Sequence, residues 1–446
     1  MSLSRSQRSA PVSRTQRWRV LMAGVCALSL LGSMAVADAA PTTRVVGYLP
    51  EWTMNRHTWD LDLLSDVMVF SGAISSKGEL TVSSGWSAAL IDALHKKGVR
   101  AGLSVRCFDP AQIHTVLTPG AAQDALIADL VDRAIVRLPG DGVDLDFEGM
   151  NAADRTALVA FVRRLVAALR AQSARAQLSL AMPAVDWNRA YDIAALADTA
   201  DFLFIMGYGY HYAGSSGAGP VAPLAPMSGT SRWGRYNLTA TLTNYLSTVA
   251  PAQRGRIVLG LPLYGIDWEV DGPDVGAKVL SGGTSIFYDS ARKGAMAAGR
   301  KWDADSSTPW YSYQRAGAWH QVWYDDGQSL GAKMDLALQG GAGGVGWWAL
   351  GYEDASLWDA VRPRVSPPPP PIDPGPGPGP GPGPGPDPDP MMGMDGPGQS
   401  GSWPEASGCA VAPMRVHARS GSGWCVVALA LIAGFLRRGR RERNSV

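Results

Sequence analysis

The sequence is poor in cysteine and has no excess of charge of either sign. Its four cysteines are scattered over 446 residues and give neither a disulfide framework nor a set of metal ligands. The formal net charge is +1 and no basic face is concentrated anywhere, which argues against nucleic acid as a partner. Charged residues make up 18% and hydrophobic residues 46%, so we expect most of the chain to be globular.

A long hydrophobic run is missing from the C-terminal end as well. The last apolar run, at 424–436, falls short of the roughly 20 residues that a membrane-spanning helix needs. It follows Gly408–Cys409 and precedes an arginine cluster of the kind that halts translocation. This order resembles the MYXO-CTERM class of sorting tails, which implies processing near the cysteine and display at the cell surface. A simple membrane tail is the alternative for residues 408–446.

The N-terminal end has the three parts of a secretory signal peptide. Several arginines precede an apolar run at 20–36, and AVADAAP then offers small-residue cleavage sites near Ala37 or Ala39. We therefore expect a signal peptide at 1–39, with an uncleaved anchor as the alternative. At the other end, dense proline and glycine predict an extended linker over 366–407. A folded body at 40–365 would then lie outside the cytoplasm and meet a membrane only through its tail.

Within this body, short apolar runs alternate with amphipathic stretches. The helical stretches include 86–98 and 154–172, and the chain has no glycine-rich fingerprint after its first strand, where YLPEW stands instead. Eight strands with helices between them predict an α/β fold, a closed (β/α)8 TIM barrel, with a small insertion at about 265–330 after strand seven. The expected strands are 44–49, 66–74, 100–105, 142–148, 177–183, 200–208, 256–264 and 344–350.

The fourth of these strands carries three acids in the sequence DGVDLDFEG. Asp144, Asp146 and Glu148 occupy every second position, so their side chains share one face of the strand. Burying like charges so close together is costly unless they share protons or hydrogen bonds. Because catalytic groups of such barrels lie at the carboxyl ends of strands, we expect Glu148 at the mouth and the two aspartates deeper.

Two other interpretations of the three acids are weaker. A calcium loop would need an acid at its twelfth position, where this chain has Arg155, and polar residues between its ligands. We therefore expect no metal. A satisfied polar core, with the acids paired to Arg106, is the purely structural alternative. Acid clusters at barrel mouths favour function over it.

The motif resembles the signature D-G-x-D-x-D-x-E of glycoside hydrolase family 18, the chitinase-type barrels. The residues that match are Asp141, Gly142, Asp144, Asp146 and Glu148. The resemblance extends from Val45 to Asp359. IMGYGY supplies Met206 and Tyr208 of the family's M-x-Y, GLPLYGIDW (260–268) matches strand seven, and Trp348 stands where the family has the tryptophan beneath the sugar.

The resemblance implies hydrolysis with retention, in which the substrate's acetamido oxygen is the nucleophile and no cofactor is needed. Glu148 would be the proton donor, Asp146 would orient the acetamido group, and Asp144 would share a proton with Asp146. Tyr208 would hydrogen-bond the acetamido oxygen and Trp348 would stack under the ring. Met206, Asp141, Tyr264 and Trp52 are further expected substrate contacts.

The chain departs from the family at two places. The third strand keeps Ser104 but has Arg106 and Cys107 where the family has glycines, and Gly209 replaces the acid that follows the family's tyrosine. Neither departure touches Glu148. The sixteen tryptophans suit sugar faces as well as a packed core, and Trp187 and Trp268 stand at strand ends where either role fits. His211 is expected to be structural.

These observations together predict a monomeric, secreted or surface-anchored enzyme that acts on a polysaccharide or oligosaccharide. The favoured reaction is cleavage of β-1,4 bonds in chitin-like polymers. Two alternatives remain: a cell-wall N-acetylglucosaminidase of the same family, and a non-catalytic, lectin-like glycan-binding protein.

Overall fold

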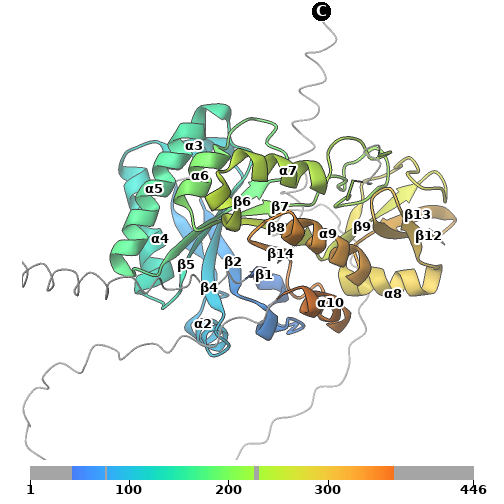
Figure 1. Ribbon diagram of the computed structural model, residues 1–446, viewed down its shortest axis with the longest axis horizontal. Coiled ribbons are helices and arrows are strands. Elements are labelled where there is room, and N and C mark those ends of the chain that lie inside the picture. The colour runs from blue at the N-terminus through green and yellow to red at the C-terminus, as the bar shows by residue number, and fades with distance from the viewer. Residues whose placement is uncertain (1–42, 76–77, 226–230, 366–446) are drawn as a thin grey trace, which may run out of the picture. The chain divides into compact units, whose positions relative to one another are not determined.

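The computed structural model describes residues 43–75, 78–225 and 231–365 (Figure 1). These residues belong to one compact unit. The expected signal peptide, linker and sorting tail lie outside the described residues. Within the described ranges, no helix combines the length and the apolar character that crossing a membrane requires.

Eight parallel strands form a closed barrel, as predicted. Their order is β1-β14-β8-β7-β6-β5-β4-β2, and β1 pairs with β2 to close the ring (Figure 1). A short strand, β3 (Leu80–Val82), adds antiparallel to β2 outside the barrel. The barrel strands are β1 Arg44–Pro50, β2 Asp66–Ile74, β4 Arg100–Cys107, β5 Gly142–Phe147, β6 Gln177–Pro183, β7 Phe202–Met206, β8 Ile257–Pro262 and β14 Gly344–Trp348.

Helices cover the outside of the barrel. The amphipathic stretch predicted at 154–172 forms α5 (Arg155–Gln172), whose buried residues recur at helical spacing and pack toward the sheet. The first connection differs from the prediction, because between β1 and β2 the structure has only the 3₁₀ turns Glu51–Thr53 and Leu61–Leu63. The remaining helices are α2 Ala88–His95, α3 Pro110–Leu117, α4 Ala121–Val131, α6 Ile193–Thr199, α7 Leu238–Thr248, α8 Tyr288–Ala298, α9 Gly327–Gln339 and α10 Ala355–Val361.

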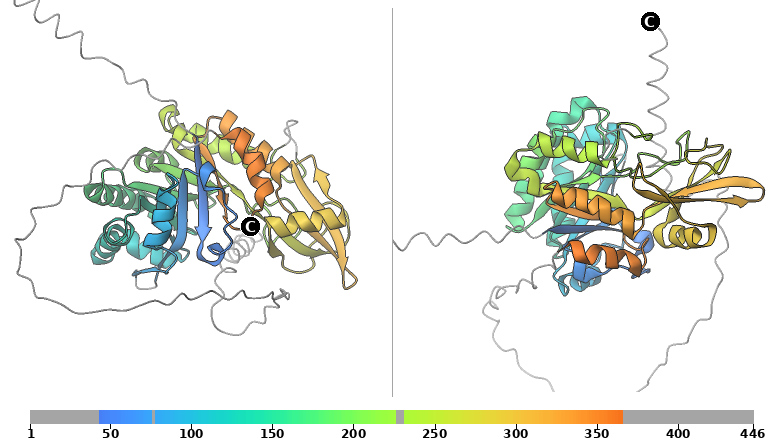
Figure 2. Two further views of the ribbon diagram at one scale, coloured as in Figure 1. Left: turned by 90° about the horizontal axis from the view of Figure 1, so that it is seen from below. Right: turned by 45° about the vertical axis from the view of Figure 1, so that its right-hand side comes forward.

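The insertion predicted after strand seven is a second, antiparallel sheet beside the barrel (Figure 2). Its order is β10-β9-β13-β12-β11, and α8 packs against it. The strand predicted over 256–264 is divided: β8 ends at Pro262, and Tyr264 already begins β9. The strands of this sheet are β9 Tyr264–Val270, β10 Thr284–Phe287, β11 Lys301–Asp303, β12 Thr308–Arg315 and β13 Ala318–Trp323.

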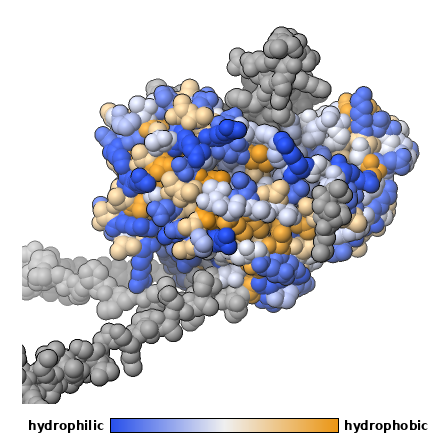
Figure 3. All heavy atoms as spheres, turned by 45° about the horizontal axis from the view of Figure 1, so that its top comes forward, coloured by the Kyte–Doolittle hydropathy of each residue, from blue (hydrophilic) through white to orange (hydrophobic). Residues whose placement is uncertain are grey.

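The chain returns from the insertion to the barrel through α9. Asp326 caps this helix by accepting hydrogen bonds from its first backbone N–H groups, and the Ser329 hydroxyl completes a capping box. Asp325 forms a fully buried ion pair with Lys333, eight residues later on α9. The segment at 320–326, which precedes α9, therefore supports that helix. Figure 3 shows one face of the body, on which apolar side chains lie across the middle among polar ones.

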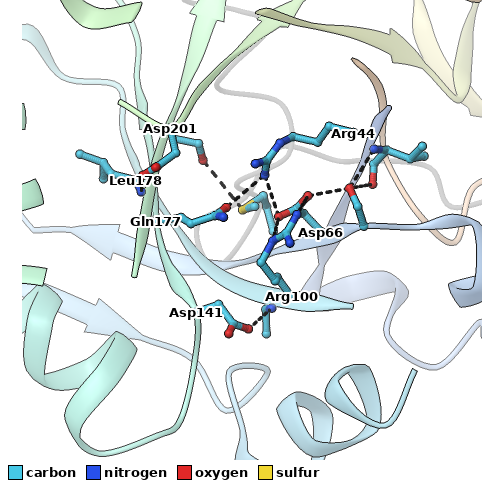
Figure 4. A network of polar contacts seen from close by, with 12 residues as sticks. Arg44, Asp66, Arg100, Asp141, Gln177, Leu178 and Asp201 are labelled. Carbon is cyan, nitrogen blue, oxygen red and sulfur yellow. Dashed lines mark hydrogen bonds and ion pairs between the residues drawn. The ribbon is translucent and has the colours of Figure 1, made fainter. Parts of the chain in front are cut away.

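The amino-terminal end of the barrel is closed by charged side chains (Figure 4). Asp66 is fully buried and accepts hydrogen bonds from Arg100 at 2.7 and 3.0 Å and from Arg44 at 2.9 Å. Gln177 of β6 accepts a further bond from Arg44 at 3.1 Å. Burial alone would raise the pKa of Asp66, but the two guanidinium groups hold it below its ordinary value. This end of the barrel is therefore a paired, structural network.

Candidate active site

The alternation of β5 separates its acids from its apolar residues. Val143, Leu145 and Phe147 belong to the main hydrophobic core, whereas Asp144 points to the opposite face, where the neighbouring strands supply hydroxyl groups. The strand ends at Phe147, and Glu148 follows directly. Gly149 then turns the chain with a φ of +78°, a conformation that favours glycine.

Asp144 is the deepest of the three acids. Its carboxylate is fully buried and accepts two hydrogen bonds of 2.7 Å, from the hydroxyls of Ser104 on β4 and Ser179 on β6. Burial raises the pKa of Asp144, and the two serine hydroxyls oppose that rise by stabilising the charged form. The surroundings contain hydroxyl groups in place of a cation.

Asp146 lies one step nearer to the mouth. Its Oδ1 atom is buried and has no hydrogen-bond partner among the described residues. Burial, followed by the charges of Glu148 and Asp144, raises the pKa of Asp146 well above its ordinary value, and Arg106 only partly opposes this. A carboxyl group in such surroundings holds a proton readily, and its free oxygen is available to a bound molecule.

Glu148 stands at the carboxyl end of the series and is partly exposed. Its backbone N–H donates to the carbonyl of Cys107 at 3.0 Å, which fixes the start of the loop against β4. Burial of the side chain raises the pKa of Glu148 to about 7. A carboxyl group with this pKa still carries a proton near neutral pH, as a general acid must.

Two tyrosines that contact each other are affected by the charges of the acids. The rings of Tyr208, which follows β7, and Tyr264, which begins β9, lie 6.1 Å apart and nearly perpendicular. The pKa of Tyr208 is raised well above its ordinary value by burial, then by Tyr264, Asp146 and Glu148. Tyr208 is therefore a neutral hydrogen-bond donor in the site.

The Gly209 departure has a backbone reason. Gly209 has a φ of +76° and open space where a Cβ would stand, so other residues would be strained there by backbone conformation rather than by a clash. The sequence pattern showed the missing acid but could not show this conformation.

Trp348 lies at the end of β14 within a group of aromatic rings. Its ring is 5.0 Å from Phe70 and 6.4 Å from Trp52, in edge-to-face arrangements. Trp52 is 39% exposed and donates its indole N–H to the Tyr352 hydroxyl at 3.0 Å, which holds an accessible aromatic side chain at the rim. Met206 packs against the aromatic cluster inside the barrel. The mouth thus offers both an acid cluster and an aromatic surface.

Two tyrosines near the acids were missed by the sequence analysis. The hydroxyl of Tyr191 donates to the backbone carbonyl of Phe147, and the pKa of Tyr191 is raised by burial and then by Glu148 and Asp146. Tyr48 of β1 is buried next to Asp144, and burial followed by the charges of Asp144 and Asp146 raises the pKa of its hydroxyl well above the ordinary value. The alternation of β1 could have indicated Tyr48, whereas no sequence pattern indicates Tyr191.

Asp141 does not join the other acids, contrary to the expectation of a substrate contact. It precedes β5 and so lies at the amino-terminal end, where it accepts hydrogen bonds of 2.7 Å from His95 and from the backbone of Ala101. Asp141 fastens α2 and β4 together at the end of the barrel opposite to Glu148. Asp141 belongs to the same sequence motif as Glu148, but the length of β5 separates the two residues in space.

The other side chains singled out in the sequence fall into two groups. Trp268 is fully buried in the core, which decides between its two open roles in favour of packing. Trp187 is 64% exposed and packs edge-to-face on Tyr236. His211 is bonded to the carbonyl of Pro220 at 2.9 Å, and burial lowers its pKa, which agrees with a structural role.

Arg106 and Cys107, which replace the family's glycines, point to opposite sides of β4. Cys107 points into the hydrophobic core, and burial raises the pKa of its thiol to about 11. Arg106 shares its strand face with Ser104 and thus points to the side where the acids lie. In the described part of the chain, no group of three or more His, Cys, Asp or Glu residues could hold a metal ion.

Comparison with known proteins agrees with this geometry. The chain is 26% identical to the glycosylase YdhD of Bacillus subtilis (strain 168), named as sporulation-specific, over 353 residues that cover 75% of this chain and 79% of that protein. It is 27% identical to the di-N-acetylchitobiase of Mus musculus over 308 residues, which cover 61% of this chain and 78% of that protein.

A solved structure gives the same result. The crystal structure of a chitinase from Chromobacterium violaceum ATCC 12472 matches with a TM-score of 0.60 and 26% identity, covering 72% of this chain and 98% of the chitinase chain. The family model described as "Glycosyl hydrolases family 18" matches residues 44–353, which include the whole barrel, the insertion and every acid of the site. The chain belongs to glycosyl hydrolase family 18.

Proposed function

We propose that the chain hydrolyses β-1,4 glycosidic bonds next to N-acetylglucosamine units, with retention of configuration. The observation that carries the proposal is Glu148, which has a pKa of about 7 and stands at the barrel mouth directly above Asp146, whose Oδ1 has no partner among the described residues. A proton donor beside a group that can hold an amide is what substrate-assisted cleavage needs.

In the proposed first step, Glu148 gives its proton to the glycosidic oxygen as the bond between that oxygen and C1 breaks. The carbonyl oxygen of the substrate's own acetamido group bonds to C1 from the opposite face, which forms an oxazolinium ion. Asp146 accepts a hydrogen bond from the acetamido N–H through its free oxygen. Asp144 is held by Ser104 and Ser179. Its charge limits how much negative charge Asp144 and Asp146 can carry together.

In the second step, Glu148 is a carboxylate and takes a proton from water. The water oxygen bonds to C1, the ring of the oxazolinium ion opens, and the acetamido group is restored. Two displacements on opposite faces leave the configuration at C1 retained. Glu148 ends the cycle protonated, so no cofactor takes part.

The aromatic residues would bind the sugar. Trp348 offers a ring for stacking beneath it and contacts the exposed Trp52, while the buried Tyr264 packs against Tyr208. Tyr208 would donate a hydrogen bond to the acetamido oxygen and hold that oxygen near C1. Met206 would fill the space below the acetamido methyl group.

The substrate class follows from the acetamido requirement and from the relatives. A di-N-acetylchitobiase and a chitinase are among them, which supports chitin or its oligosaccharides. Peptidoglycan also contains N-acetylglucosamine and is the second candidate. A lectin-like role is less well supported, since Glu148, Asp146 and Asp144 are all present.

We also propose that the enzyme works at the cell surface, tethered by residues 408–446, as a fractionation experiment with and without that segment would test.

The test uses the full chain beside its Glu148→Gln form. Chitin oligosaccharides and purified peptidoglycan are each incubated with both proteins, and products are identified by mass and by the anomer formed first. Cleavage by the unchanged chain that gives the β-anomer first and is lost in Glu148→Gln supports the proposal. Glu269→Gln, a change on β9 of the insertion, is the matched control. Binding of both glycans without cleavage would instead favour the lectin-like role.

A further inference from the structure

We propose that Arg106 binds a carboxylate on the substrate, so that the preferred glycan carries an acidic group next to the N-acetylglucosamine unit that is cleaved. This inference rests on the proposed function and, within its substrate class, favours peptidoglycan, the second candidate, over chitin. It concerns a residue that the family resemblance marks only as a departure.

The first argument is the position of Arg106 on β4. Ser104, two residues earlier, contacts Asp144, so Arg106 extends from the same face of the strand but nearer the mouth. The β4–β5 register pairs Ser104 with Asp144 and Arg106 with Asp146. The arginine is therefore level with the acid that is proposed to hold the acetamido group.

The second argument is the surface on which the guanidinium rests. It lies 5.2 Å from the centre of the Phe70 ring, and the same ring packs edge-to-face on Trp348 at 5.0 Å. Phe70 thus connects the cation to the ring on which the sugar is proposed to stack. A substituent on a sugar bound over Trp348 would reach the guanidinium without leaving the mouth.

The third argument is that the guanidinium has N–H groups to spare. Its one hydrogen bond within the described ranges is long, 3.5 Å to the carbonyl of Gly72, and none of the ion pairs found there includes Arg106. The contrast with Arg44 and Arg100 is direct, because both of those hold Asp66 at 3.0 Å or less. Asp146 attracts Arg106 but does not bind it.

The chemistry of the missing partner follows from these contacts. When a substrate fills the mouth and displaces water, N–H groups left without an acceptor cost binding energy. A carboxylate matches the planar fork of a guanidinium with two parallel hydrogen bonds. Chitin has only neutral hydroxyl and amide groups, whereas a glycan with lactyl or peptide carboxylates can supply the anion. The nearby acids hold protons readily, which reduces their repulsion of such a substrate.

The test compares three tetrasaccharides with the full chain. One alternates N-acetylglucosamine with N-acetylmuramic acid and has free lactyl carboxylates, the second is the same molecule with the carboxylates converted to carboxamides, and the third is chitotetraose. Binding is measured by calorimetry in the Glu148→Gln background, and kcat/KM in the active chain. We expect the carboxylate form to be preferred over the carboxamide form by roughly tenfold to a hundredfold.

Arg106→Gln should bring that ratio to about one, and Arg106→Lys should keep part of it because the charge remains while the fork is lost. Arg163→Gln, an exposed change on α5, should leave the ratio as it is. The inference is overturned if the unchanged chain binds carboxylate and carboxamide forms equally, or if Arg106→Gln weakens both by the same factor. Because binding is measured without turnover, absence of cleavage would count against the proposed function alone.

Discussion

The two ends of the barrel bury carboxylates in opposite ways. At the amino-terminal end, Asp66 is surrounded by Arg44 and Arg100, and its pKa lies below the ordinary value although burial alone would raise it. At the carboxyl-terminal end, Asp144 has two hydroxyls and Asp146 has an oxygen without a partner, and burial raises the pKa of both. The three aspartates are buried to a similar depth, so their hydrogen-bond and ion-pair partners decide whether the pKa is raised or lowered.

The difference shows where this fold gives up stability for chemistry. A carboxyl group whose pKa is raised by folding binds its proton more tightly in the folded chain. Its contribution to stability is therefore present below the ordinary pKa and is lost as the pH rises through the folded value. For Glu148 that loss runs from pH 4.5 to about 7. For Asp66 the sign is reversed, because its stabilising effect is present near neutral pH and is lost as the pH falls through its lowered folded pKa.

The largest effect is expected at Glu148. Glu148→Gln removes the proton donor, so kcat should fall by about 10²- to 10⁴-fold, the usual range for general acid catalysis. The same change should raise the free energy of unfolding at pH 8 by up to about 3 kcal/mol, since it removes a charge that folding disfavours. Urea unfolding at pH 8 and pH 4 measures this, with almost no gain expected at pH 4. If Glu148→Gln lowered the free energy of unfolding at pH 8, folding would not disfavour the charge of Glu148.

Asp66 should respond in the opposite way. Asp66→Asn leaves two guanidinium groups without a buried counter-charge, which should lower the free energy of unfolding by about 3–5 kcal/mol. The kcat of the folded fraction should stay within about twofold, because the site lies at the other end of the strands. Asp62→Asn, an exposed partner of Lys97, is the control and should cost less than about 1 kcal/mol. The comparison between the ends fails if Asp66→Asn lowers kcat as much as stability.

The pH dependence of cleavage is the next smaller effect. With a pKa of about 7, Glu148 loses its proton above neutral pH, so kcat/KM should fall about tenfold for each further pH unit. Initial rates on an uncharged oligosaccharide between pH 5 and pH 9 measure this limb. A rate that stays level up to pH 9 would show that Glu148 keeps its proton beyond the range that its burial explains.

Much of the fold and the acid series could be predicted because both depend on local periodicity. Short apolar runs indicated each barrel strand, and the alternation of Asp144, Asp146 and Glu148 put the acids on one face. The error at Asp141 has a simple geometric cause. The six residues of β5 separate it from Glu148, so the two lie seven steps or roughly 23 Å apart at about 3.3 Å per step, and one motif spans both ends of the barrel.

Contacts between distant segments could not be predicted in the same way. Tyr191 reaches Phe147 across 44 positions of sequence, and the unpaired state of Arg106 depends on what every neighbouring strand supplies. Trp268 lies four residues after the predicted end of a strand, but it belongs to β9, a separate strand of the insertion, and its ring is fully buried. Patterns in a single sequence predict which strand or helix a residue belongs to and on which face it lies. Its contact partners depend on how the strands are arranged in the closed barrel.

The smallest predicted effect lies on one strand that serves both ends. On β6, Gln177 binds Arg44 at the amino-terminal end, and Ser179, two residues later on the same face, binds Asp144. Either residue changed to Ala loses one hydrogen bond to a charged or ionisable group, so each should cost about 1–3 kcal/mol of unfolding free energy. They should differ in activity, because Ser179 contacts an acid of the site directly, whereas Gln177 contacts only Arg44 at the opposite end. Ser179→Ala should therefore lower kcat severalfold while Gln177→Ala leaves it unchanged, as parallel unfolding and rate measurements would show. Equal rates in the two variants would mean that the hydroxyl on Asp144 supports the strand and not the acid series.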